Sequence, residues 1–211
     1  IDKGRFVVLV GLNLASSGKA AEQNTRENTA QKSNTISFDS DFTGYQSTSG
    51  IASLLLAPLS VAQQAQLPIY AQLNGLSVSA VNADSMKEAV LESLRNSNDV
   101  HISLIEVSAL EDEFHSDLES SVLLEAYANA YEGTYAGDPL TRAISCARSI
   151  TGEGAGFSQV LGLLRTVIAL QQRYIPGIND WQTPKKEQLI NWQSSSFYFP
   201  TESRTRYPNA D

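Results

Sequence analysis

Two short apolar runs constrain the fold of this chain more than any other feature of its sequence. Phe6–Val10 is a continuous run of apolar, mostly β-branched residues, and Ile51–Leu56 is interrupted only by Ser53. Neither run shows the alternation of polar and apolar residues that is typical of a strand with one face in water. Both runs are therefore predicted as β-strands that are buried on both faces.

Helical patterns alternate with further strand-like segments along the chain. One helix is predicted after a cap at Asp84 or Ser85, because Ser85 and Glu88 have the spacing of a capping box. Two more are predicted over Glu113–Ala130 and Phe157–Gln172. The residues expected to face inward are Met86, Ala89, Val90 and Leu94 in the first helix and Leu118, Val122, Leu123, Ala126 and Ala130 in the second.

The remaining segments are predicted as strands, a loop and a tail. The strands are Tyr70–Val78, His101–Ser108 and Ala143–Ala147, although Asn74-Gly75 leaves a hairpin turn open as an alternative for the first of them. A polar loop or frayed helix is expected over Asn13–Thr35. An ordered, irregular tail from Tyr174 is expected to wrap the surface, because its aromatic side chains need to be buried: Trp181, Trp192, Phe197, Tyr198 and Phe199. Strands that alternate with helices indicate a layered α/β fold.

Composition excludes several classes of protein. The chain has 211 residues, of which 42% are hydrophobic and 18% charged, so it is too apolar to be disordered. Its net charge of −8 argues against binding to nucleic acid or to an anionic membrane surface. The apolar runs are too short to span a membrane. One cysteine and two histidines exclude an internal disulfide framework and a Cys/His zinc cluster, so we expect a reducing cytoplasm.

Three candidate sites each have an ordinary structural alternative. Gly152–Gly156 (GEGAG) is either a phosphate-binding turn or a tight turn that lets helix and sheet approach closely. Cys146 is either a nucleophile or a buried structural thiol. His115, with Glu111–Glu113 and Asp117, is either a metal site or a solvated helix start. In each case the structural alternative is favoured, so no bound cofactor or metal is expected.

Several segments, in order, resemble the C-terminal half of a β-ketoacyl synthase. The first is Ser37–Leu59, where Phe38-Asp39 and Gly44-Tyr45 match motifs that precede an apolar strand in that family. Pro68–Ser79 resembles the next strand. The most specific segment is Ile144–Pro176, which aligns without gaps. The end of the chain, SSFYFPTESRTRYPNAD, resembles a stretch near the ketosynthase C-terminus.

The resemblance carries five site positions over to this chain. Glu106 and Glu119 match glutamates of the family, whereas Ser108 takes the place of the first catalytic histidine. Arg148 takes the place of a lysine, and Glu153 that of the second catalytic histidine. Condensation needs a cysteine nucleophile and two imidazoles that promote decarboxylation and stabilise the enolate. The resemblance therefore implies that no intact catalytic residue lies in this chain.

The implied fold is the layered α/β/α thiolase-like fold, of which the chain would supply about half. Residues 1–36 would end the N-terminal half and link it to the C-terminal half in residues 37–211. The chain lacks an initiator Met and stops before the final glycine-rich turn of the family, so we expect a fragment that begins and ends inside a fold unit. Alone, such a piece is expected to expose apolar surface and to associate.

The implied function is that of a degenerate ketosynthase, or chain length factor, in a polyunsaturated fatty acid or polyketide synthase. It would pair with an active ketosynthase or an identical subunit, as well as with the missing N-terminal half, and would help shape the acyl tunnel. An acyl carrier protein would present phosphopantetheine-linked acyl chains. Two alternatives stay open: an acyltransferase-type condensing enzyme with altered residues, and a scaffold only. This chain alone is not expected to be an enzyme.

Overall fold

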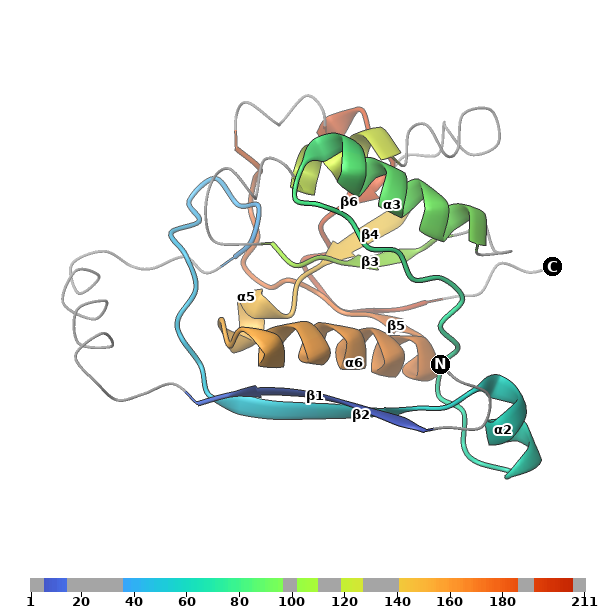
Figure 1. Cartoon of the computed structure of the whole chain (residues 1–211). Coiled ribbons are helices and arrows are strands. Elements are labelled where there is room, and N and C mark those ends of the chain that lie inside the picture. Colours follow the sequence, from blue (N-terminus) through green and yellow to red (C-terminus); the bar gives the residue numbers. More distant parts are fainter. Residues whose placement is uncertain are drawn as a thin grey trace.

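The computed structural model describes residues 6–14, 36–96, 102–109, 119–126, 141–185 and 192–206. Its elements form four successive layers, which Figure 1 shows from bottom to top. A two-stranded ribbon is followed by a central helix, a three-stranded sheet and an outer helical layer. This order confirms the predicted layered α/β class.

The ribbon consists of β1 (Val7–Asn13) and β2 (Gly50–Leu56), paired antiparallel from Val7 opposite Leu56 to Asn13 opposite Gly50. Helix α6 (Gly156–Gln172) packs on one face of the ribbon. Gly11 makes this packing possible, because a Cβ there would lie 2.2 Å from the carbonyl oxygen of Gly156. A short helix, α2 (Leu59–Gln64), follows β2 and was not predicted.

The sheet contains β3 (Leu104–Glu106), β4 (Arg142–Ser145) and β6 (Phe197–Tyr198), with β4 in the middle and parallel to both neighbours. α6 contacts β3 from the ribbon side, and α3 (Ala83–Asn96) lies on the other side (Figure 1). Residues 119–126 are also helical. The main hydrophobic core lies here and includes Phe38, Val107, Leu123, Ile144, Cys146, Ile178, Trp192, Phe197 and Phe199.

Three predictions need correction. The strands of the ribbon are not buried on both faces, because α6 covers only one of them, and Val8 and Ile51 are 63% and 67% exposed. Tyr70–Val78 forms neither a strand nor a hairpin; it runs as an irregular segment, with Gly75 close to the backbone of Ser93 in α3.

The cap of α3 is one of these corrections. The side chain of Asn82 accepts a hydrogen bond from the backbone N–H of Ser85 at 3.0 Å, so Asn82 caps the helix in place of Asp84 or Ser85. Val90 and Leu94 pack against the core, as predicted. The predicted strand over residues 101–108 is confirmed for β3 (Leu104–Glu106), and one backbone hydrogen bond at each end, from Val107 to Ser145 and from Ala143 to Ser103, both at 2.9 Å, continues its contact with β4.

The C-terminal tail is ordered and buries aromatic side chains, as predicted, and it also forms strands that were not predicted. It supplies β6 to the sheet, and its side chains Trp192, Phe197 and Phe199 are buried in the core against Phe38. Two further short strands, β5 (Tyr174–Ile175) and β7 (Arg204–Thr205), pair antiparallel. Aromatic side chains bury large areas, which explains why this irregular segment is drawn into the interior.

The other predicted helices agree with the structure where they can be compared. α6 begins one residue before the predicted Phe157 and ends at Gln172 as predicted. Val122, Leu123 and Ala126 are buried in the helical residues 119–126, whereas the rest of the predicted Glu113–Ala130 helix and most of the Asn13–Thr35 loop lie outside the described residues. In the part of the chain that the structure describes, no helix is long and apolar enough to cross a membrane.

Candidate functional site

Arg148 brings three of the predicted site residues together. Its Nε pairs with the carboxylate of Glu153, and its Nη1 donates to both the backbone carbonyl and the Oγ of Ser108, the latter at 2.7 Å. The side chain of Arg148 is 4% exposed and that of Glu153 is 29% exposed. A buried guanidinium is thus held by a counterion and by the two oxygens of Ser108.

The chain places these groups by a sharp turn after β4. Arg148 begins the short helix α5 (Arg148–Thr151), which ends at Gly152 with φ of +81°. A Cβ at Gly152 would lie 2.4 Å from the carbonyl oxygen of Gln46, so only glycine allows this approach. The backbone of Glu153 then pairs with residues 46 and 48, at 2.8 Å and 2.9 Å. This pairing fixes Glu153 beside Arg148.

The same turn accounts for the GEGAG motif. Its N–H groups are used within the chain: Glu153 donates to Gln46, Gly154 to Ser158 at 2.7 Å, and Ala155 to the carboxylate of Glu153 at 2.5 Å. A phosphate would need these donors to be available. The arrangement therefore favours the predicted close-approach turn over the phosphate-binding turn.

Glu119 supports the same cluster from the neighbouring helix. Its two carboxylate oxygens accept the backbone N–H groups of Ser108 at 2.9 Å and Ala109 at 2.7 Å. Ala109 has φ of +45°, in the left-handed region. Burial raises the pKa of the Glu119 carboxyl, while the two hydrogen bonds and the charge of Arg148 oppose that rise. Glu119 thus holds the loop that presents Ser108.

Glu106 lies in a second, separate ion pair. Its carboxylate accepts from Arg165 of α6 at 3.0 Å and from the backbone N–H of Ala147 at 2.5 Å. Arg165 also donates to the Oγ of Ser145. Burial raises the pKa of the Glu106 carboxyl, and the charge of Arg165 opposes this. These contacts tie β3, β4 and α6 together, so Glu106 has a positioning role beside the Arg148 cluster.

Sequence reasoning missed a buried hydroxyl cluster that includes Ser149 of α5. Ser37 Oγ is hydrogen-bonded to Tyr45 Oη and, at 2.7 Å, to Ser149 Oγ, and Tyr45 Oη lies 3.7 Å from the Sγ of Cys146. Burial raises the pKa of both the Tyr45 phenol and the Cys146 thiol. In the sequence Tyr45 belongs only to the Gly44-Tyr45 motif, and nothing local links it to residues 146–149.

Cys146 is fully buried, as the structural-thiol alternative predicts. The candidate metal site of His115, Glu111–Glu113 and Asp117 lies outside the described residues, so the structure does not test it. Among residues 6–14, 36–96, 102–109, 119–126, 141–185 and 192–206, no three His, Cys, Asp or Glu side chains are grouped so that they could hold a metal ion.

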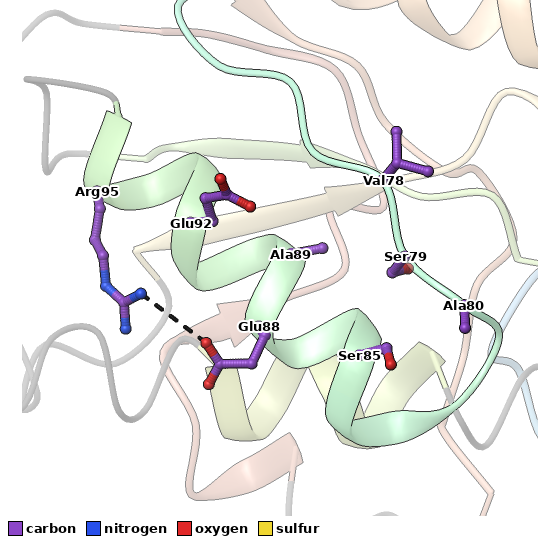
Figure 2. Close-up of a pocket in the computed structure, with 8 residues that line it drawn as sticks. All are labelled: Val78, Ser79, Ala80, Ser85, Glu88, Ala89, Glu92 and Arg95. Carbon is purple, nitrogen blue, oxygen red and sulfur yellow. Dashed lines mark ion pairs between the residues drawn. The ribbon is translucent and has the colours of Figure 1, made fainter.

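A surface groove of about 460 Å³ lies elsewhere, between the segment 78–80 and α3 (Figure 2). Glu88, Glu92 and Arg95 line it, with Arg95 3.9 Å from Glu88 in an exposed ion pair. The groove shares no residue with the Arg148 cluster. It is lined by solvated side chains without buried polar groups that would bind a ligand, so we take the Arg148 cluster as the candidate site.

Comparison with known proteins identifies the fold. No family model matches the chain, and no curated protein matches it. Among solved structures, the ketosynthase from module 1 of the bacillaene synthase of Bacillus amyloliquefaciens FZB42 matches 98% of the chain with a TM-score of 0.77 at 17% identity. The fold is that of a ketosynthase.

Two further structures share this ketosynthase fold. The ishigamide ketosynthase/chain length factor matches 95% of the chain with a TM-score of 0.72 at 17% identity, and this match covers 48% of its own chain. The AntDE:AntF complex, a ketosynthase with its acyl-carrier protein, matches 94% of the chain with a TM-score of 0.70 at 14% identity, which covers 50% of that chain. The present chain spans only 38% of the bacillaene ketosynthase. The thiolase-like fold expected from the sequence is therefore confirmed.

Proposed function

We propose that this chain belongs to a ketosynthase-fold component of a polyketide or polyunsaturated fatty acid synthase that does not itself catalyse condensation. The observation that carries the proposal is the Arg148 cluster. By resemblance, Ser108, Arg148 and Glu153 stand where the family has a histidine, a lysine and a second histidine. Here the three side chains bind one another in an arrangement that needs no substrate group.

The chemistry of these groups supports the proposal. Condensation generates an enolate, whose negative charge must be stabilised by hydrogen-bond donors or cations that are available to it. The carboxylate of Glu153 would instead place a like charge beside the enolate and raise the barrier. The positive charge of Arg148 is already paired with Glu153, and the hydroxyl of Ser108 cannot act as a base near neutral pH. Neither Ser108 nor Glu153 therefore replaces the imidazole that the family has at its position.

A role beside an active ketosynthase is the function that remains. Two structural neighbours support this role. One is the ishigamide ketosynthase/chain length factor, and the other is a ketosynthase in complex with its acyl-carrier protein. We infer that the protein pairs with an active ketosynthase and helps shape the tunnel for acyl chains carried on phosphopantetheine by an acyl carrier protein. A reducing cytoplasm is the proposed location.

Release of carbon dioxide from a malonyl-loaded acyl carrier protein tests the proposal directly. The purified whole protein that contains this chain, without a partner subunit, is expected to release none above a protein-free control, while an active ketosynthase in a parallel reaction does. Release by this protein would instead support the altered condensing enzyme. The experiment needs no partner subunit, so it measures decarboxylation by this protein alone.

A second measurement separates the chain-length role from a scaffold. The protein is combined with its active ketosynthase, and the products of Glu153→Ala and Glu125→Ala variants are compared by mass spectrometry. Glu125 is a matched control because it also forms an ion pair, with Lys87 at 3.0 Å, but its side chain is 63% exposed. A shift in product length only with Glu153→Ala supports the tunnel role. Unchanged products with both variants would support a scaffold.

A further inference from the structure

The Glu153 carboxylate is bound by two donors that come from different elements. One is the buried guanidinium of Arg148, whose Nε forms an ion pair with Oε2. The other is the backbone N–H of Ala155, which donates to Oε1 at 2.5 Å. Figure 1 shows that α5, which begins with Arg148, lies beside the first turn of α6, which Ala155 precedes. A cation and a backbone N–H thus converge on one carboxylate.

The start of α6 adds to the attraction for an anion at this point. α6 has 17 residues, but its cap residue makes no side-chain hydrogen bond and its first turn contains no acidic residue. The first N–H groups of a helix have no partners within the helix, and their dipoles favour a nearby negative charge. Glu153, two residues before the cap, supplies this charge from outside the helix. Its carboxylate is therefore held by the guanidinium and by the helix end together.

Both donors are held in place without the side chain of Glu153. Arg148 Nη1 donates to the backbone carbonyl and the Oγ of Ser108. The backbone of Glu153 is fixed by hydrogen bonds with Gln46 and Thr48, at 2.8 Å and 2.9 Å. Arg148 Nε is buried and ion-paired, yet it makes no hydrogen bond with any described residue. A buried donor without a hydrogen bond is costly, so the guanidinium needs an anion even when Glu153 is absent.

We propose that Arg148 and the N–H of Ala155 form a carboxylate-binding site that Glu153 fills as an internal ligand, which closes it to a malonyl group and to other small carboxylates. Guanidinium groups bind carboxylates by charge-assisted hydrogen bonds. The side chain of Glu153 ends in a carboxymethyl group, which is also the free end of a malonyl thioester. It is 29% exposed, so the place that it occupies is open to solvent. Only the choice of the malonyl group rests on the proposed function; the carboxylate site rests on the contacts.

Chemical rescue of Glu153→Ala tests the site in the whole protein that contains this chain. The substitution removes a carboxymethyl group, which has the same heavy atoms as acetate. Acetate binding is measured by saturation-transfer NMR and by the change in Tm. For Glu153→Ala we expect a Kd of about 1–10 mM, within the limit for so small a ligand, and a Tm that rises with acetate concentration. The unsubstituted protein should show neither effect, and acetamide or chloride should not replace acetate.

Three further variants separate the site from a general effect of charge. Glu153→Gln removes the charge but leaves an amide of the same shape in the site, so it is expected not to bind acetate. Arg148→Met/Glu153→Ala removes the guanidinium and should not bind acetate either. Glu125→Ala is the matched control, because it breaks an ion pair whose carboxylate is 63% exposed; acetate and chloride should affect its Tm equally. Acetate binding that persists without Arg148 would overturn the proposal.

The folding of Glu153→Ala is itself informative. If the variant is folded, as judged by circular dichroism, a lack of acetate binding would overturn the proposal. If it unfolds, refolding in acetate but not in chloride would support the site, and failure to refold in either would contradict it.

Malonyl-pantetheine tests the choice of ligand. It is expected to bind Glu153→Ala and not the unsubstituted protein. Acetate binding without malonyl-pantetheine binding would refute the exclusion of a malonyl group, while the carboxylate site would stand. Release of carbon dioxide by the unsubstituted protein would instead contradict the proposed function and leave the acetate result in place. The two failures are therefore distinguishable.

Discussion

Replacing Glu153 by Gln removes the counterion of a buried cation while keeping the shape of the side chain. Removing one partner of a fully buried ion pair costs about 3–5 kcal/mol, whereas an exposed pair contributes about 0.2–1 kcal/mol. Arg148 is 4% exposed but Glu153 is 29% exposed, and the two oxygens of Ser108 still accept from Arg148 in the variant. We therefore expect a loss of about 2 kcal/mol in the free energy of unfolding, between those limits.

Urea unfolding followed by circular dichroism measures this loss, and thermal unfolding should show a Tm lower by about 4–8 °C for a chain of this size. The control is Glu125→Gln, which breaks the exposed pair with Lys87 and should cost less than about 1 kcal/mol. The double variant Arg148→Met/Glu153→Gln removes both charges and should recover at least half of the loss. Equal effects of Glu153→Gln and Glu125→Gln, or no recovery in the double variant, would refute the reasoning.

Three further predictions concern the neighbourhood of the site. Gly152→Ala should lower the free energy of unfolding in urea by more than about 1 kcal/mol, because its Cβ would lie 2.4 Å from the carbonyl oxygen of Gln46. Gly156→Ala, whose Cβ would meet nothing within 4 Å, should not cause this loss; equal losses in the two variants would contradict the close approach. Cys146 should resist an aromatic disulfide reagent in the native protein and react fully in concentrated guanidinium, because burial raises its pKa and blocks access; rapid native labelling would contradict this. Burial raises the pKa of Glu119, so the folded state binds more protons than the unfolded state and stability should fall as pH rises through that pKa. Glu119→Gln should make this fall shallower, with the part due to the buried Glu106 remaining; parallel pH profiles of the two proteins would contradict the reasoning.

Local sequence patterns predicted the elements whose shape depends on near neighbours. α6 was found almost to the residue because its apolar positions follow the helical period over 17 residues. The exposure of the ribbon was not found, because a run such as Phe6–Val10 shows that a strand suits burial but not whether a second layer is present. Tyr70–Val78 likewise has a strand pattern but pairs with no strand in the described part of the chain.

The candidate site likewise contains residues that the sequence indicates and contacts that it does not. Resemblance aligned Ser108, Arg148 and Glu153 as separate positions, and the structure brings the three into contact. The contact of Ser37 with Ser149 joins residues more than a hundred positions apart and has no local signal. Long-range hydrogen bonds of this kind depend on the packed fold, so periodicity and motif spacing do not predict them.

The aromatic core has a consequence for how the chain is made. Phe38 packs against Trp192 and Phe199, with ring centroids 6.0 Å and 5.9 Å apart, so the two walls of the core come from distant parts of the sequence. Phe199 must have left the ribosome before these rings can meet. Assembly of this core is thus expected to be slow, because large loops must close before the contacts form. During that interval the unpaired aromatic side chains are targets for chaperones.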